Sequence, residues 1–454
     1  MLCEGRYRFS HKCNPGLLVS VGTTTGISFF KAILMQSIST KNVCAVLLGM
    51  ALCLSWSAGA AETYRWVQYV PGGLEARAIS ENGACPEALV DGVAVAMRLR
   101  STPGEHYPIT VCALPLPPAT QRLQIGDTAM VLPRTSPQRI LVIGDTGCRL
   151  KGKRVQACND PVAWPFRAGA AHVAQLKPDL IVHVGDFHYR ESPCPEGNSG
   201  CAGTPYGDTW AVWKEDFFSP VGKLLATAPW VLVRGNHEEC DRGGRGWART
   251  LDPYAWSADT GCLPPAEPYL VDIGGVAIAV ADVSTADEDS ANEQQAARYR
   301  QQYANLARDA HKPVWIAQHR PIWALETTTP KPAGDNKTLA AAAADGFATN
   351  VMALLSGHHH VLEMLTYDRA LPPQLISGHG GDDLSTGVPV KSDGMSINGV
   401  PVKRGIAKAG SFGYSLLERS GTLEDTAWTF SGFDYQGKLL LKCALRGRDV
   451  TCGD

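Results

Sequence analysis

Five short polar motifs, each placed directly after an apolar run, constrain the fold of this 454-residue chain more than any other feature. The runs before the first three motifs, at 140–143, 180–184 and 230–233, are short and rich in β-branched residues, which is typical of buried strands. Polar groups at the carboxyl ends of such strands meet in one crevice of an α/β sheet, so we expect one shared site. The motifs are Gly144-Asp145-Thr146-Gly147, Gly185-Asp186-Phe187-His188-Tyr189, Gly235-Asn236-His237-Glu238, Gln318-His319 and Gly357-His358-His359-His360.

The side chains that these motifs offer are oxygen and imidazole donors. Hard and borderline metal ions prefer donors of this kind. His358 and His360 are two residues apart, so they share one face of an extended segment, whereas His359 points the other way. The motifs therefore predict a metal site in which His359 is not a ligand.

Taken together, the motifs resemble those of the calcineurin-like metallophosphoesterase superfamily, and within it the purple-acid-phosphatase-like branch, over residues 138 to 380. The resemblance implies a four-layer α/β/β/α sandwich and two metal ions bridged by Asp186. A scaffold that keeps this fold without its metals is the alternative, which the presence of every donor disfavours. The implied ligands are Asp145, Tyr189 and His360 for one ion, and Asn236, His319 and His358 for the other.

The sequence departs from the superfamily in two places. Gly147 stands where the more common first motif, D-x-H, has a histidine, so this motif offers no imidazole. The purple enzymes often carry a further histidine some residues after the lone one, and nothing between His319 and His358 supplies it. The second donor to the leaving group is therefore unassigned.

The charge of the two donor sets predicts which ions they hold. Asp145, Asp186 and a Tyr189 phenolate are three oxygen anions, which favour a trivalent ion, and only a strong positive charge ionises a phenol at neutral pH. The amide of Asn236 and two imidazoles suit divalent zinc, manganese or iron. We expect Fe(III) together with divalent Fe, Zn or Mn.

His237 is the best candidate for contact with the phosphate or for protonation of the leaving oxygen, with Glu238 orienting its ring. Asp186 and His237 are thus the expected catalytic residues. Arg149, just after the first motif, either binds a substrate phosphate through two hydrogen bonds or forms a surface salt bridge. Two further candidates for substrate contact are His188, inside the second motif, and His379, in a glycine-rich turn.

The first 61 residues read as a leader that contains a secretory signal. The apolar run 43–56 is too short to span a bilayer comfortably, Lys41 precedes it, and the small residues 57–61 follow. Met35 is the expected true start, and a retained membrane anchor is the alternative. Four of the fourteen cysteines lie in this leader, and the even remainder favours disulfides over a zinc site, because no C-x-x-C pair exists. The expected pairs are Cys85–Cys112, Cys148–Cys158, Cys194–Cys201, Cys240–Cys262 and Cys443–Cys452.

We divide the mature chain into a small β-rich N-terminal domain, 62–136, and a metallophosphoesterase domain, 137–454. No catalytic pattern occurs in the first, so support of the second is its expected role. Within the second, helices are expected at 165–176, 216–226 and 290–309 and antiparallel strands at 412–452. A long loop at 190–213 is expected to shape the substrate mouth, and 325–346 to form a surface segment.

These observations predict an exported phosphoester hydrolase, periplasmic or secreted, that uses a metal-bound hydroxide on monoesters. A phosphodiesterase or nucleotide hydrolase with the same metals is one alternative, and a non-catalytic phosphate- or metal-binding protein is another. The net charge of −2 argues against binding of a nucleic-acid duplex. We expect a small phosphoester as the partner, no stable membrane insertion after signal cleavage, and we infer no protein partner.

Overall fold

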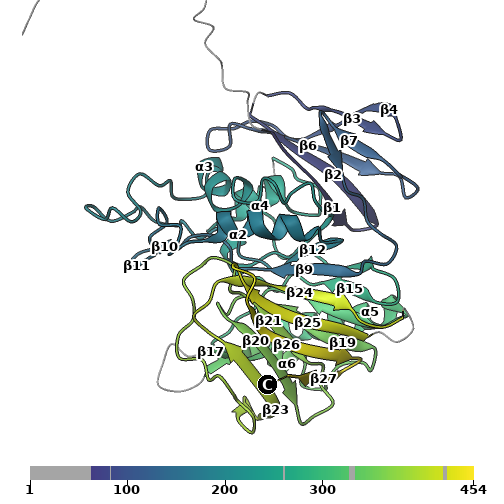
Figure 1. Cartoon of the computed structure of the whole chain (residues 1–454), viewed down its shortest axis with the longest axis vertical. Helices are drawn as coiled ribbons and strands as arrows, with labels where there is room; N and C mark the ends of the chain where they lie inside the picture. Colours follow the sequence, from purple (N-terminus) through teal and green to yellow (C-terminus); the bar gives the residue numbers. More distant parts are fainter. Residues whose placement is uncertain (1–62, 82, 259–260, 327–332, 423–426, 454) are drawn as a thin grey trace, which may run out of the picture. The chain divides into compact units, whose positions relative to one another are not determined.

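The computed structural model describes residues 63–453 except 82, 259–260, 327–332 and 423–426. All of them belong to the compact unit formed by 61–454 (Figure 1). The predicted leader, 1–61, with its signal and alternative start, lies outside the described residues.

Two large sheets form the centre of this unit. The first has eleven strands, in the order β27 (Asp449–Cys452), β26 (Leu439–Arg446), β25 (Ala427–Asp434), β24 (Gly413–Arg419), β9 (Arg139–Ile143), β12 (Leu180–His183), β13 (Trp230–Leu232), β1 (Thr63–Val70), β2 (Gly73–Ser80), β6 (Thr110–Leu116) and β5 (Arg98–Ser101). The second has eight, in the order β14 (Tyr269–Asp272), β15 (Ala277–Val280), β16 (Val314–Ala317), β19 (Val351–Ser356), β21 (Gln374–Ser377), β20 (Leu362–Tyr367), β23 (Val400–Lys408) and β22 (Ser396–Ile397).

Helices and short strands surround the two sheets. The helices are α2 (Phe166–Val173), η1 (Ala174–Leu176), α3 (Trp210–Trp213), η2 (Lys214–Phe218), η3 (Asn236–Glu238), α4 (Gly244–Thr250), α5 (Glu293–Ala310) and α6 (Lys337–Ala342). The short strands are β3 (Glu87–Val90), β4 (Val93–Ala96), β7 (Leu123–Ile125), β8 (Thr128–Met130), β10 (Leu150–Lys151), β11 (Arg154–Val155), β17 (Trp323–Glu326) and β18 (Ala333–Asp335).

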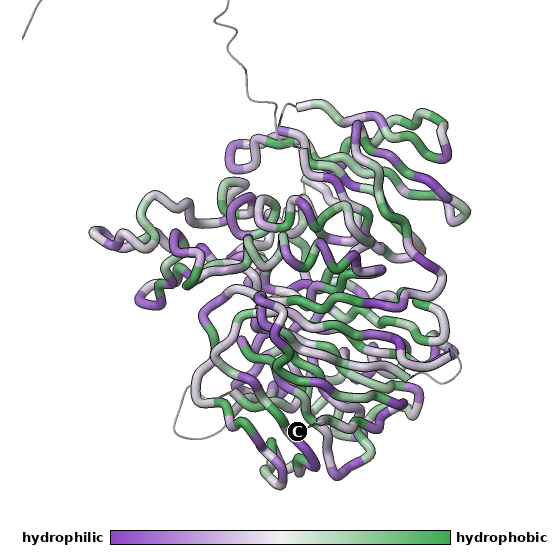
Figure 2. Tube along the Cα trace, in the orientation of Figure 1, coloured by the Kyte–Doolittle hydropathy of each residue, from purple (hydrophilic) through white to green (hydrophobic). Residues whose placement is uncertain are grey.

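Successive side chains of the central strands belong to different apolar clusters, which separate the layers of the fold. On β9, Ile140 and Val142 pack against Trp315 of the second sheet, whereas Leu141 and Ile143 belong to a different apolar cluster with the helices α2 and α3. On β16, next to Trp315, Ile316 packs instead with residues of α5 and α6. Because successive side chains of a strand point to opposite faces, each sheet has one face on the other sheet and one face on helices. This confirms the predicted four-layer α/β/β/α arrangement, whose strands are mostly apolar (Figure 2).

The residues before 137 are β-rich, as predicted, and their strands β1, β2, β6 and β5 extend the first sheet. β1 runs parallel to β13, with Gln68 opposite Trp230. The guanidinium of Arg77, fully buried on β2, donates hydrogen bonds to the carbonyl oxygens of Thr250 and Asp252 at the end of α4. This segment therefore supports the helix layer, and the domain boundary at 136/137 stays a prediction.

The helix predicted at 165–176 is present as α2 and η1, and the one at 290–309 as α5, capped by the side chain of Asn292. The helix predicted at 216–226 instead starts at Trp210 and ends at Phe218. Pro220 explains this end, because proline lacks the N–H of a helical residue and disfavours helix in the residue before it.

The prediction of a surface segment at 325–346 is wrong for the second half of that range. Asn336 caps α6, whose side chains Leu339 and Ala342 are buried. Residues 327–332 of that segment lie outside the described part. The antiparallel strands predicted at 412–452 are present as β24 to β27.

All five predicted disulfides are present: Cys85–Cys112, Cys148–Cys158, Cys194–Cys201, Cys240–Cys262 and Cys443–Cys452. Among the residues that the structure describes, we find no helix that combines the length and the apolar character needed to cross a membrane.

Candidate metal centre

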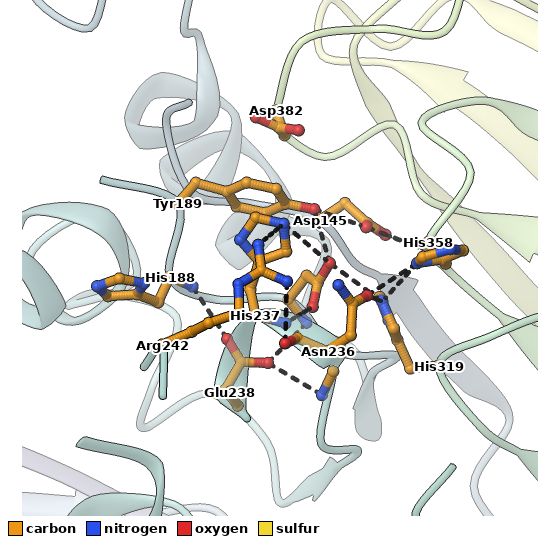
Figure 3. Close-up of polar contacts among 12 residues, drawn as sticks. Asp145, His188, Tyr189, Asn236, His237, Glu238, Arg242, His319, His358 and Asp382 are labelled. Atoms are coloured by element: carbon orange, nitrogen blue, oxygen red, sulfur yellow. Dashed lines mark hydrogen bonds and ion pairs between the residues drawn. The ribbon is translucent and has the colours of Figure 1, made fainter. Parts of the chain in front are cut away.

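The five motifs lie at the carboxyl ends of strands β9, β12, β13, β16 and β19. In the first sheet β9, β12 and β13 are parallel neighbours, and in the second sheet β16 and β19 are parallel neighbours. Their carboxyl ends therefore share an edge, and the motif side chains meet there (Figure 3). The single site expected from the sequence is present.

Three of the predicted ligands have an unusual backbone conformation. Asp145, Asp186 and His358 have φ angles of 56°, 57° and 71°, in the left-handed region that residues other than glycine rarely adopt. Such conformations cost free energy and persist where the surrounding structure imposes them, which is often at functional sites. The fold holds these three side chains in place at a cost in stability.

The first predicted donor set surrounds the hydroxyl of Tyr189. Its Oη lies 2.9 Å from Asp145 Oδ1, 2.9 Å from Asp186 Oδ2 and 3.1 Å from His360 Nε2. A phenol has only one hydrogen to donate, so it cannot satisfy both carboxylates. The four side chains are thus gathered around one point.

The second predicted donor set shares Asp186 with the first. His319 Nε2 lies 3.1 Å from Asp186 Oδ2 and 3.0 Å from Asn236 Oδ1. His358 Nδ1 lies 2.9 Å from the same Asn236 oxygen and 3.3 Å from His319 Nε2. Asp186, His319 and His358 form a group whose ligand atoms all lie within 4.8 Å of one another.

Each of the three predicted histidine ligands keeps one ring nitrogen occupied outside the site. His319 Nδ1 lies 2.8 Å from the carbonyl oxygen of Val184, and His360 Nδ1 lies 2.7 Å from that of Asp383. His358 Nε2 lies 2.6 Å from Glu288 Oε1. A metal-binding histidine usually holds its second nitrogen in this way, because the contact fixes the ring's orientation and tautomer.

The electrostatics of the site also fit positive ions. Asp145 and Asp186 are both buried, and buried charges are normally paired or bound to metal. Burial and the charge of Asp186 hold the pKa of Asp145 well above its usual range. Burial and the charges of Asp145 and Asp186 raise the pKa of Tyr189 in the same way. Metal ions at this point would relieve the repulsion, so the donors present fit the implied pair of metals.

Glu238 shapes the backbone of the site. Its carboxylate accepts hydrogen bonds from the N–H groups of Gly235, Asp186, Phe187 and His188 at 2.8–3.1 Å. Gly235 leaves room for this arrangement, because a Cβ there would lie 2.1 Å from Asp186 Oδ1. Glu238 thus supports the loop that carries Asp186, whereas its predicted position was against the ring of His237.

The carboxylate that contacts the ring of His237 belongs to Glu191. His237 Nδ1 lies 2.7 Å from Glu191 Oε1, and Nε2 lies 2.6 Å from Arg242 Nη2. The ring is buried and contacts that of Tyr189, with centroids 3.9 Å apart and the two planes tilted by 38°. His237 Nε2 also lies 3.9 Å from Asp186 Oδ2, so His237 is at the metal-facing side of the site (Figure 3).

Arg149 and His379, two predicted substrate contacts, have other surroundings in the structure. Arg149 is buried and forms an ion pair with the buried Asp382. His379 is fully buried, burial lowers its pKa to about 4, and the backbone of Phe433 is a neighbour. Their substrate contacts stay predictions, and for Arg149 the contact requires departure from Asp382.

His188 lies beside the site, in the wall of a cavity of about 440 Å³ that Glu191 and Arg242 also line. Its Nε2 lies 3.1 Å from the carbonyl oxygen of Gly207. A larger cavity of about 760 Å³, lined in part by Trp323, contains none of the motif residues. The smaller cavity is the one that adjoins the candidate metal centre.

Three supporting residues were missed in the sequence: Glu191, Arg242 and Glu288. Glu191 follows the second motif by two residues and Arg242 follows His237 by five, so proximity to the motifs was the available signal. Glu288 lies far from His358 in sequence and nothing around it marks its role. Only the packing of the chain brings it to the ring.

The fold and this donor set define the class of the protein as a metal-dependent hydrolase of phosphoester bonds. Residues 138–362 match the family described as calcineurin-like phosphoesterase, and through them the chain belongs to that family.

The fold resembles those of two solved structures. One is a purple acid phosphatase from yellow lupin (Lupinus luteus) seeds, with 13% identity, a TM-score of 0.57 and coverage of 85% of this chain and 74% of that chain. The other is PhoD, with 11% identity, a TM-score of 0.52 and coverage of 87% and 93%. At these identities the likeness shows the fold alone. The comparison with curated proteins finds no match.

Proposed function

We propose that this protein is an exported phosphomonoesterase that holds two metal ions on Asp145, Asp186, Tyr189, Asn236, His319, His358 and His360. The observation that carries the proposal is the position of Asp186 between two donor sets. Its Oδ2 lies 2.9 Å from Tyr189 Oη in one set and 3.1 Å from His319 Nε2 in the other. A carboxylate shared in this way is what a pair of ions about 4 Å apart requires.

The donors support an Fe(III) ion beside Tyr189 and a divalent Fe, Zn or Mn ion beside Asn236. The first set contains two carboxylates and a phenol, and the second a neutral amide and two imidazoles. When bound, such ions supply the positive charge that activates water and polarises the phosphoester.

The protein's own residues place the substrate. Nε2 of His237 lies between Asp186, which belongs to the metal donors, and Arg242, which lines the cavity. A phosphoryl group bound to the ions, with its leaving group in the cavity, would lie beside this nitrogen. Hydrolysis forms a bond from the water oxygen to phosphorus and breaks the bond from phosphorus to the leaving oxygen, which gains a proton. We propose that His237 contacts the phosphoryl group during this reaction.

A monoester fits the surroundings of the site better than a diester. The cavity beside the site is lined on one side by Glu191, Gly207, Asp208 and Thr209, all from the long loop 190–213. A volume of about 440 Å³ suits one leaving group of moderate size. The position of this loop and the size of the cavity support a monoester.

Export is supported by the disulfides. Five disulfides are characteristic of a protein that folds in an oxidising compartment such as the periplasm or the exterior of the cell. The apolar run 43–56 with the small residues after it supplies the matching secretory pattern.

The test is hydrolysis of 4-nitrophenyl phosphate and of bis(4-nitrophenyl) phosphate by metal-supplied protein. We expect the monoester to be preferred and Asp186→Ala to lower kcat/KM by about 10³-fold or more, since several kcal/mol of charge stabilisation are lost. Asp345→Ala, at a carboxylate that is 89% exposed, is the control and should retain activity. Preference for the diester would contradict the substrate class, and no turnover would favour a binding protein.

A further inference from the structure

We infer that Arg242 is a second cationic contact for the substrate's phosphoryl group, beside His237, and that Glu191 positions both side chains. This inference rests on the proposed function and deepens it. It names a second donor to the phosphoryl group in a chain that lacks the additional histidine that the purple enzymes often have.

The geometry that carries the inference is a compact triad. Arg242 Nε lies 3.0 Å from Glu191 Oε1, and the same oxygen lies 2.7 Å from His237 Nδ1. Arg242 Nη2 also contacts Glu191 and lies 2.6 Å from His237 Nε2. One carboxylate therefore contacts a guanidinium and an imidazole that lie side by side.

The direction of these hydrogen bonds decides what the triad offers. A guanidinium has only donors, so Nε2 of His237 accepts from Arg242 Nη2 and the hydrogen of the neutral ring is on Nδ1, beside Glu191. One N–H group of the guanidinium thus donates to a neutral nitrogen, which is a weaker acceptor than a phosphate oxygen. We expect an anionic phosphoryl oxygen to replace this contact and to receive the hydrogen bond from Arg242.

Other arginines near the site have different partners. Arg149 is paired with Asp382, Arg190 with Asp216 and Arg320 with Glu288, each by an ion pair. Among the described residues, Arg242 is the arginine whose guanidinium contacts His237. It also lines the cavity that we assign to the leaving group, so it lies between the metal donors and that cavity.

A purely structural role is the competing explanation. Arg242 Nη1 donates a hydrogen bond of 3.1 Å to the carbonyl oxygen of Asn236, a predicted metal ligand. Loss of activity in a variant therefore distinguishes the two roles only when its metal content and fold are intact. The variants and readouts below are chosen to separate the two roles.

The test compares Arg242→Met, Arg242→Lys and Glu191→Gln with Arg308→Met as the matched control. Arg308 carries the same charge and also pairs with a carboxylate, that of Asp309, but it lies on α5 and does not line the cavity beside the site. For each protein we would measure metal content, circular dichroism, kcat and KM for aryl and alkyl phosphates, and inhibition by inorganic phosphate.

With metal content unchanged, Arg242→Met should lower kcat/KM by about 10²-fold, the typical loss when one donor to a developing anion is removed. The inhibition constant of inorganic phosphate should rise about tenfold or more, because a charge-assisted hydrogen bond is lost. Arg242→Lys should recover part of both losses. Glu191→Gln should lower kcat more than it raises KM, and Arg308→Met should behave like wild type.

A direct binding measurement keeps this inference separate from the proposed function. The melting temperature of metal-loaded protein is measured with and without inorganic phosphate, which requires no turnover. A phosphate-induced rise that disappears in Arg242→Met and remains in Arg308→Met supports the inference even if wild type hydrolyses nothing. An equal rise in both variants, or loss of activity accompanied by loss of metal, overturns it.

Discussion

The hydroxyl of Tyr189 lies 2.9 Å from a carboxylate oxygen of Asp186, three residues earlier in the chain. The same hydroxyl lies 2.9 Å from Asp145, which belongs to a motif that ends in Gly147 rather than histidine. A Cβ on Gly147 would lie 2.9 Å from the ring of Tyr189, so this ring takes up the space beside Gly147. This position underlies the first prediction.

Tyr189→Phe should abolish a visible colour of the iron-loaded protein. A phenolate on Fe(III) gives a ligand-to-metal charge-transfer band, and phenylalanine keeps the ring's packing without the oxygen. The visible spectrum and the Fe(III) content of both proteins check this. Tyr367→Phe is the control, since its buried hydroxyl binds the carbonyl oxygen of Trp323. Colourless iron-loaded wild type, or a spectrum unchanged in Tyr189→Phe, would show that the phenol is only packed beside the site.

Purified mature protein should contain close to two metal ions per chain, one of them iron. Asp145 and Asp186 are buried together, so removal of the ions by a chelator should also lower the melting temperature, as loss of any tightly bound ligand does. Elemental analysis and thermal unfolding before and after chelation measure both effects. One ion or none after full metal supply would defeat the two-metal proposal.

Glu363 makes stability depend on pH. Burial raises its pKa from 4.5 to about 8. Between these values the folded protein keeps the proton while the unfolded chain loses it, so the free energy of unfolding falls as the pH rises from 4.5 to about 8. In Glu363→Gln the free energy of unfolding should fall less steeply than in wild type, by up to about 1.4 kcal/mol per pH unit.

Urea unfolding at several pH values across this window checks the Glu363 prediction. Glu87→Gln, at an exposed glutamate on β3, is the control and should follow wild type. Parallel curves for wild type and Glu363→Gln would mean that Glu363 does not titrate differently on folding.

Arg77→Met should destabilise the protein by about 3–5 kcal/mol, as removal of one partner from a buried ion pair typically does. Arg77 is fully buried, contacts Glu75 at 2.6 Å and donates to two carbonyl oxygens at the end of α4. Arg98→Met, at an exposed arginine of β5, should change stability little. Chemical unfolding compares the two, and a loss below about 1 kcal/mol in Arg77→Met would refute the supporting role.

Exported protein should begin at Ala61 or Glu62, and its ten remaining cysteines should resist alkylation until reduced. The secretory pattern before Glu62 and the five disulfides are the reasons. Mass spectrometry of native and reduced samples measures both. An intact leader in exported material, or mostly free thiols, would count against export.

Local patterns in the sequence were sufficient for the fold class, the donors and the disulfides. Asp145, Asp186 and Asn236 could be read as neighbours because each closely follows a buried strand, and parallel strands deliver such residues to one edge. Nearby cysteines could be paired because the chain between them is short. In each case the information lies within a few residues of the group concerned.

The tertiary structure alone decided the contacts between segments that are distant in sequence. Arg149 lies 233 residues from Asp382, so its ion pair could not be read from the motif beside it. Glu191 and Arg242 flank His237 from two different loops, and Glu288 reaches His358 from a third. Sequence periodicity describes which face a side chain occupies, whereas the partner on the opposite side depends on how the layers pack. The sequence therefore determined which polar groups meet at the candidate site, and the packed fold determined which groups surround them.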